Sequence, residues 1–140
     1  MRWIQRDLKL KPYSRGFHLI THEVITALPE ISTLQSGILH VFIQHTSASI
    51  TINENTDATV RSDFESFFTR LVPENTGDYI HNYEGLDDMP AHLKASILGF
   101  SVQIPLQHGK LKLGTWQGIY LGEHRNYASN RKLFLTLFGQ

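Results

Sequence analysis

The sequence contains no cysteine, and its charged residues balance to a formal net charge of zero at pH 7. The missing thiols exclude disulfides, a thiolate metal site and a cysteine nucleophile. Because the basic residues are also scattered, a broad surface for nucleic acid or for an anionic membrane is not expected. Long hydrophobic runs are missing too: charged residues interrupt the segment from Met1 to Asp7. We therefore expect neither a signal peptide nor a spanning segment, and a cytoplasmic location.

What is present is typical of one folded domain. The chain has 140 residues, of which 41% are hydrophobic and 19% charged, enough to bury a core without disulfides. No repeat, low-complexity tract or linker divides it, so a single domain is predicted over residues 1–140. Its eight histidines are about double the usual share. Histidine is the commonest side chain for proton transfer near neutral pH and binds borderline metals, so a cluster of these residues would indicate a site.

Strands dominate the predicted secondary structure. We expect strands over 3–10, 37–43, 100–106, 110–123 and 133–138, and helices over 23–28, 58–71 and about 88–98. Strands and helices do not alternate regularly. The fold class is therefore predicted to be α+β, a mostly antiparallel sheet or sandwich with two or three packed helices.

The two longer predicted helices carry apolar residues at helical spacing. Asp57 or Thr56 is a plausible cap for the first, and Gly99 is a plausible stop for the second. The predicted buried stripe of the first helix is Val60, Phe64, Phe67, Phe68 and Leu71, and that of the second is Met89, Leu93 and Ile97. Asp88, His92 and Ser96 also recur every fourth residue, on another face of the second helix.

The stretch QHTSASITINENTD, residues 44–57, alternates polar and apolar groups as an amphipathic strand does. One face would carry His45, Ser47, Ser49, Thr51 and Asn53, and the other Ala48, Ile50 and Ile52. The polar face could meet water, as is usual in antiparallel sheets, or it could line a site. Glu54 and Asp57 at its end could orient an imidazole or form a turn.

The segment YIHNYEGLDDMPAHLK, residues 79–94, places His81 in a polar loop before a helix and His92 inside that helix. Together with Lys94 and the helix N-terminus, these histidines could hold a metal-bound phosphate. In the alternative, Asp88 caps the helix, His92 faces solvent and His81 is an ordinary loop residue. No standard short zinc spacing is present.

The segment LGTWQGIYLGEHR, residues 113–125, alternates glycine with aromatic residues on one strand face. Glycine inside a strand indicates that something approaches the backbone closely, such as a ligand ring or a neighbouring subunit. Equally, Trp116 and Tyr120 could fill the glycine gaps within the core of the domain. The sequence has no Gly-x-Ser-x-Gly elbow, no P-loop and no dinucleotide fingerprint.

Three segments together, HTSASITINEN, DDMPAHLKAS and GTWQGIYLGEHR, resemble the YjbQ-like family, often described as secondary thiamine-phosphate synthase. The resemblance extends to SRGFH at 14–18 and RLVPE at 70–74, and so to nearly the whole chain. It implies a small α+β domain that assembles as a homotrimer. It also implies a polar pocket with histidines, which holds a metal in some members.

The resemblance assigns roles residue by residue. The implied metal ligands are His45, His81 and His92, holding a divalent cation, with zinc expected and nickel, cobalt or iron able to bind similar ligands. The implied catalytic residues are Glu54 and Asp88, which would hold a histidine tautomer or move a proton. The implied substrate-binding residues are Thr46, Ser47, Asn53, Lys94, Ser96, Trp116, Gln117 and Arg125. Relatives often carry cysteine and phenylalanine where this chain has Gly122 and His124, so a cysteine nucleophile is not expected and His124 is auxiliary.

The function implied by the resemblance is that of a metal-binding transferase acting on a small phosphorylated compound. Its thiamine-phosphate synthase activity would join a pyrimidine, which loses pyrophosphate, to the nitrogen of a thiazole phosphate. The alternative is a non-catalytic trimeric module that senses a phosphorylated metabolite and assembles through the glycine/aromatic strand.

Overall fold

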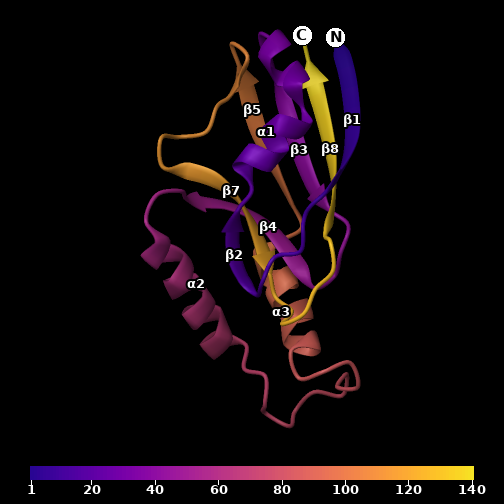
Figure 1. The fold of residues 1–140 in the computed structure, drawn as a ribbon, viewed down its shortest axis with the longest axis vertical. Coiled ribbons are helices and arrows are strands. Elements are labelled where there is room, and N and C mark those ends of the chain that lie inside the picture. The colour runs from indigo at the N-terminus through magenta and orange to yellow at the C-terminus, as the bar shows by residue number, and fades with distance from the viewer.

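The computed structural model describes all residues, 1–140, as two antiparallel β-sheets with helices beside them (Figure 1). The larger sheet has the order β1 (Arg2–Lys9), β8 (Lys132–Gly139), β3 (Ser36–Ile43), β5 (Ser101–Gln107) and β6 (Lys110–Leu111). The smaller sheet has the order β2 (Gly16–Leu19), β7 (Gln117–Glu123) and β4 (Ala48–Glu54). The predicted α+β class is confirmed. The strand predicted over 110–123 is instead divided, because a turn in which Gln117 Oε1 accepts from Gly114 N separates β6 from β7.

The core lies between the inner faces of the two sheets, as the period of two along each strand requires. It contains Leu39, Val41, Ile43, Leu133, Leu135 and Leu137 from the larger sheet, and Ala48, Ile50, Ile119 and Leu121 from the smaller. The short helix α1 (Thr21–Ala27) and the 3₁₀ helix η1 (Pro29–Thr33) add Val24 and Ile31. The predicted core face of the stretch at 44–57 is therefore confirmed for Ala48 and Ile50.

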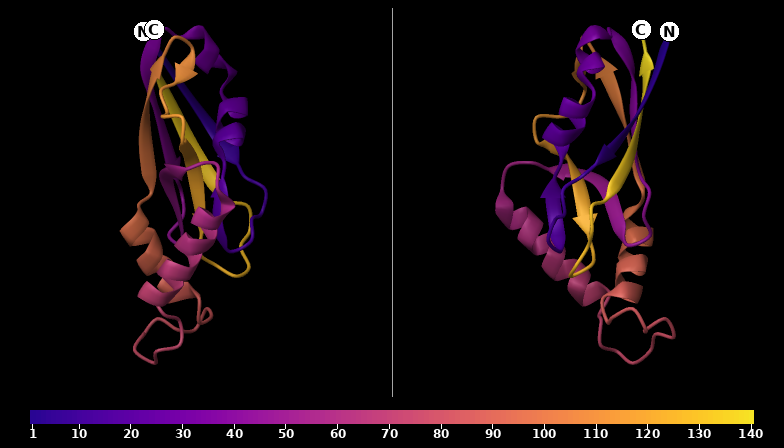
Figure 2. Two further views of the ribbon diagram at one scale, coloured as in Figure 1. Left: turned by 90° about the vertical axis from the view of Figure 1, so that its left-hand side faces the viewer. Right: turned by 45° about the vertical axis from the view of Figure 1, so that its right-hand side comes forward.

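Helices α2 (Ala58–Leu71) and α3 (Asp88–Leu98) flank the smaller sheet, α2 beside β2 and α3 beside β4 (Figures 1 and 2). The predicted start of α2 at Asp57 and the predicted stop of α3 at Gly99 are confirmed, but no aspartate side chain caps the start of α3. The Asp57 carboxylate accepts a hydrogen bond from Thr59 N at 2.9 Å, and Gly99 follows α3 with a φ of 105°, which a glycine adopts readily. None of the helices combines the length and the apolar character needed to cross a bilayer.

The predicted buried stripe of α3 is wrong, and that of α2 holds only in part. Helix α3 buries Asp88, Ala91 and Lys94, and Ile97 is 58% exposed. The small side chain of Ala91 lets α3 approach β4 closely, so charged residues one turn on either side become buried with it. Helix α2 has no fully buried residue, although Phe64 and Phe68 lie against the Phe17 ring.

Candidate metal centre

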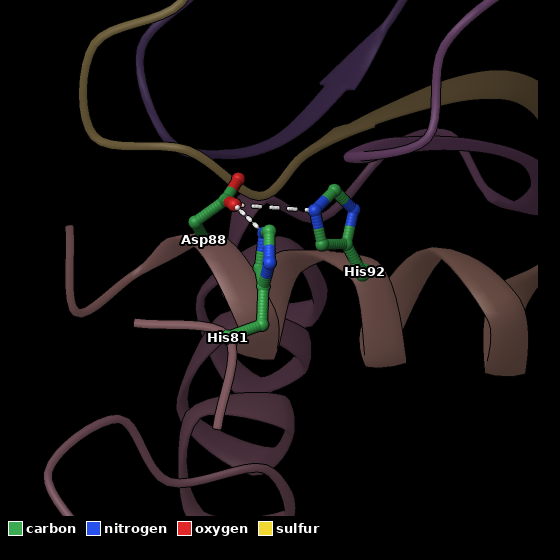
Figure 3. A group of neighbouring side chains, drawn as sticks. All are labelled: His81, Asp88 and His92. Carbon is green, nitrogen blue, oxygen red and sulfur yellow. Dashed lines mark hydrogen bonds and ion pairs between the residues drawn. The ribbon is translucent and has the colours of Figure 1, made fainter. Parts of the chain in front are cut away.

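The side chains of His81, Asp88 and His92 converge at the N-terminus of α3 (Figure 3). His81 comes from the long loop between α2 and α3, and Asp88 and His92 lie one helical turn apart. Their ligand atoms all lie within 4.8 Å of one another. Oδ2 of Asp88 is 2.7 Å from Nε2 of His81 and 3.2 Å from Nε2 of His92. Two imidazoles and one carboxylate thus point at a common position.

The His92 ring is held by the main chain of another element. Its Nδ1 lies 2.9 Å from the carbonyl oxygen of Thr46, which can only accept, so Nδ1 carries the hydrogen. In the neutral ring, the lone pair of Nε2 then faces the carboxylate of Asp88. Two electron-pair donors at that separation need a cation between them, either a metal ion or a proton. A histidine that ligates a metal usually donates its other N–H in this way.

The carboxylate of Asp88 is also held in one orientation. Its Oδ1 accepts a hydrogen bond from Arg125 Nη1 at 2.6 Å, and only 2% of the side chain is exposed. The same guanidinium donates to Asp87 Oδ2 at 2.9 Å and to the carbonyl of Glu84 at 2.9 Å. Oδ2 of Asp88 is thereby left to the histidines. Asp87, which the sequence suggested only as a possible cap of α3, is part of this support.

Asp87 remains ionised because its hydrogen-bond partners lower its pKa by more than burial raises it. Burial raises the pKa of Asp87, but hydrogen bonds from Asn126 N and from Arg125 bring it below the ordinary value. The turn before it requires glycine: Gly85 has a φ of 113°, and a Cβ at this position would lie 2.9 Å from Oδ1 of Asp87. The EGLDD turn is the part of this arrangement that the sequence signals. Arg125, which binds the turn, lies far along the chain and could not be paired with it from the sequence.

The structure does not place His45 in this group. Its Nε2 accepts a hydrogen bond from Lys132 N at 2.8 Å, because a main-chain N–H can only donate. The neutral ring therefore carries its hydrogen on Nδ1 and has no free lone pair for a metal. Burial, followed by the charge of Arg131, lowers the pKa of His45, which favours this neutral form. Of the three predicted imidazoles, the structure brings together those of His81 and His92, with Asp88 beside them, and leaves out that of His45.

His45 and His92 do line the same hollow, of about 240 Å³. The other residues around it are Thr46, Ala48, Ala95, Ser96 and Phe100. Thr46 and Ser96, both predicted to bind substrate, thus lie beside the metal group. Ser47, predicted with them, is buried, and its carbonyl accepts from Arg131.

Four further predicted site residues lie at the C-terminal end of β4, away from the end that leads to Thr46 and His92. The strand has seven residues, Ala48 to Glu54, and so a length of about 20 Å. The Glu54 carboxylate accepts hydrogen bonds from Thr56 N and Asp57 N, and is thus a turn former. Asn53, Trp116 and Gln117 are its neighbours there. The structure does not bring Glu54 to the histidines, so its predicted catalytic role has no geometric support.

Lys94 does not face a ligand either. It is 1% exposed, between α3 and the smaller sheet, and its Nζ makes no hydrogen bond. Burial lowers the pKa of Lys94, and the charge of Arg15 lowers it further. The structure gives no support to phosphate binding by Lys94, whose burial was not visible because helical periodicity does not reveal which face of α3 meets β4.

The polar face of β4 is buried in its first half, at Ser49 and at Ser47 just before the strand, and is exposed to water at Asn53. Ser49 is fully buried, and its Oγ lies 2.9 Å from Nε2 of His124. Burial, followed by the charge of Lys94, lowers the pKa of His124 to about 3. Gly122 makes room for the pair, since a Cβ there would lie 2.3 Å from the Ser49 oxygen. The cross-strand register that pairs Ser49 with Gly122 is not visible in the sequence.

The glycine/aromatic segment is largely internal. Strand β7 is the central strand of its sheet, with residues 118–123 buried, so a neighbouring subunit cannot pack on it as the trimeric-module alternative supposed. Tyr120 is fully buried within the domain, as the core interpretation predicted. Trp116 lies outside the strand and is 63% exposed.

The fold and the site define a small α+β protein with a candidate metal centre of two histidines and one aspartate. The chain belongs to the YjbQ-like family, because the family model described as UPF0047 protein YjbQ-like matches residues 6–140. The UPF0047 protein YjbQ of Escherichia coli O157:H7 is 51% identical over 138 residues, which cover 99% of each chain. The Synechocystis protein sll1880 is 44% identical over 116 residues, which cover 83% of this chain and 79% of the relative.

Solved structures agree with this assignment. A YbjQ-like protein of unknown function from Sulfolobus solfataricus P2 superposes with a TM-score of 0.87 at 26% identity and covers 99% of both chains. A YjbQ/UPF0047 family protein from Clostridium acetobutylicum superposes with a TM-score of 0.82 at 42% identity, covering 96% of this chain and 99% of the other. The resemblance seen in the sequence is confirmed.

The thiamine-phosphate synthase activity expected from that resemblance is wrong. The family is designated UPF0047, the names of its members carry no activity, and the Sulfolobus structure is described as one of unknown function. Nothing among these relatives supports the joining of a pyrimidine to a thiazole phosphate.

Proposed function

We propose that the protein is a metal-dependent enzyme whose divalent cation is held by His81, Asp88 and His92. The observation that carries this proposal is the orientation of His92. Its Nδ1–H is fixed on the Thr46 carbonyl, which turns the Nε2 lone pair toward the carboxylate. A site built for a proton alone would not need a second imidazole at 2.7 Å from the same oxygen atom.

The donor set supports zinc or a similar transition metal. Imidazole with carboxylate suits zinc, iron, cobalt or nickel, and three protein ligands leave at least one position open. A cation bound there would supply an activated water or polarise a carbonyl. The chain itself contributes the orientation: the Thr46 carbonyl sets the His92 tautomer, and Arg125 sets the carboxylate.

The competing interpretation is an ion pair in which protonated histidines surround Asp88 without any metal. Metal analysis separates the two. The wild type is dialysed against zinc at pH 7.5, washed free of loose ions and analysed for zinc per chain. We expect one zinc per chain in the wild type and a large loss in His81→Gln and His92→Gln. The exposed His22, on α1, supplies the matched control His22→Gln.

The catalytic part of the proposal needs its own readout. Hydrolysis of p-nitrophenyl acetate reports a metal-activated water without assuming the natural substrate. We expect zinc-loaded wild type to hydrolyse the ester faster than the metal-free protein and faster than zinc-treated His92→Gln. Equal rates in all three samples would contradict water activation. Zinc in the wild type without a loss in either histidine variant would contradict the assigned ligands.

We also propose that the chain self-associates as a homotrimer through the outer face of the larger sheet. Trp3, Phe138 and Ile38 form one cross-strand row on this face, and Trp3 is 69% exposed. Phe134 and Phe42 form a second aromatic row. An exposed apolar surface of this kind marks an interaction site. Sedimentation equilibrium tests the proposal: we expect a trimer mass in the wild type and a lower mass in Ile38→Asp, whereas a wild-type monomer would contradict it.

A further inference from the structure

The hydrogen-bonding state of His45 can be read from a single contact. Lys132 N donates to His45 Nε2 at 2.8 Å, and this is the hydrogen bond that the His45 side chain makes. Because Nε2 accepts this hydrogen bond, it carries a lone pair, and the hydrogen of the neutral ring is on Nδ1. His45 therefore presents a neutral N–H donor and has no acceptor or metal-ligating atom left.

This donor lies next to the candidate metal centre. His45 and His92 line the same hollow of about 240 Å³. Thr46 also lines this hollow, and its carbonyl oxygen accepts the hydrogen bond from Nδ1 of His92. Phe100 supplies an aromatic wall and is 61% exposed. A molecule in the hollow would thus contact one metal ligand, one neutral donor and one apolar ring.

We propose that His45 positions the ligand of the metal centre, donating its Nδ1–H to an oxygen of a small molecule that binds the cation and extends into this hollow. The ligand class is a small compound with metal-binding oxygen atoms, such as a carboxylate or hydroxamate, whose apolar part rests on Phe100. The inference depends on the proposed metal at His81, Asp88 and His92. It gives His45 a role in ligand binding and none in metal binding.

The first test requires neither metal nor ligand. Long-range ¹H–¹⁵N NMR of the metal-free protein at pH 7.5 distinguishes the two histidine tautomers by their nitrogen shifts. We expect His45, assigned by its loss in His45→Leu, to show hydrogen on Nδ1 and a lone pair on Nε2. Hydrogen on Nε2, or a doubly protonated ring, would overturn the inference.

The second test measures ligand binding to the zinc-loaded protein, with acetohydroxamate as the probe. We expect His45→Leu to keep its zinc but to raise the acetohydroxamate Kd about tenfold, the usual worth of one hydrogen bond. In His45→Asn, the side-chain amide replaces the Nδ1–H donor, so the Kd should stay within about threefold. His22→Leu is the control for a histidine outside the hollow.

The outcomes separate this inference from the proposed function. A wild type that binds no zinc would contradict the proposed function. A wild type that binds zinc, with the same acetohydroxamate Kd in His45→Leu, would contradict only the role of His45. Loss of zinc in His45→Leu would also overturn the inference, because it would make His45 part of the metal site.

Discussion

The Thr46 carbonyl oxygen lies 2.9 Å from Nδ1 of His92 and so determines which nitrogen of that ring faces Asp88. The contact joins the loop before β4 to helix α3, two segments that are 46 residues apart in the chain. Because the acceptor is a main-chain atom, side-chain substitution at Thr46 leaves it in place. The proposed metal site is thus set by the packing of α3 against β4.

Arg125 supports this site without contacting the cation position. We expect Arg125→Met to weaken zinc affinity by about 10- to 100-fold, as is usual when a partner of a metal ligand is removed. The unfolding free energy should also fall by about 3 kcal/mol, because two buried carboxylates lose their cation. Competitive zinc titration and urea denaturation measure the two effects. Arg70→Met, in the last turn of α2, is the control, and unchanged zinc affinity in Arg125→Met would refute the supporting role.

Lys94→Met removes a buried amine that makes no hydrogen bond. Because a buried amine without a hydrogen bond is costly and methionine has a similar volume, we expect the unfolding free energy to rise by about 1 kcal/mol. Zinc content should not change. Thermal and urea unfolding test the first expectation and metal analysis the second. Loss of stability together with loss of zinc would show that the Lys94 amine does serve the site.

Buried His124 should make the fold sensitive to acid. Its pKa is about 3 in the folded protein, against an ordinary value of 6.5. Between these pH values the unfolded chain binds a proton that the folded chain does not, so stability is full above pH 6.5 and falls as pH drops toward 3. The loss amounts to a few kcal/mol at most, at about 1.4 kcal/mol per pH unit.

His124→Phe tests this dependence, since its ring can pack on Phe17 as the imidazole does. Urea unfolding is measured from pH 7 down to pH 4 in both proteins. We expect a smaller decrease in the unfolding free energy of the variant. The same decrease in both proteins would assign the acid sensitivity to other groups.

The features that depend on neighbouring residues were predictable from the sequence. Asp57 and Gly99 were recognised as the ends of α2 and α3, and the alternation of apolar residues gave the core faces of the strands. Asp88 and His92 are one helical turn apart, so the sequence also predicted that they share one face of α3. Such patterns are local, and their physical causes act within a few residues.

The features that depend on distant partners were not predictable. His45 looks like a metal ligand in the sequence, but the main-chain N–H of Lys132, 87 residues away, occupies its lone pair. Lys94 looks like a surface cation, but the packing of α3 against β4 buries it. In both cases the tertiary contact, and not the residue type, decides the role.

The most direct test of the account is the zinc content of wild type and of Asp88→Asn after dialysis against zinc at pH 7.5. Asparagine keeps the shape of the side chain and removes its charge, so the fold can be verified by unfolding in both proteins. The account predicts one zinc per chain in the wild type and little or none in the folded variant. A wild type that retains no zinc, or a folded variant that retains as much as the wild type, would contradict the metal centre.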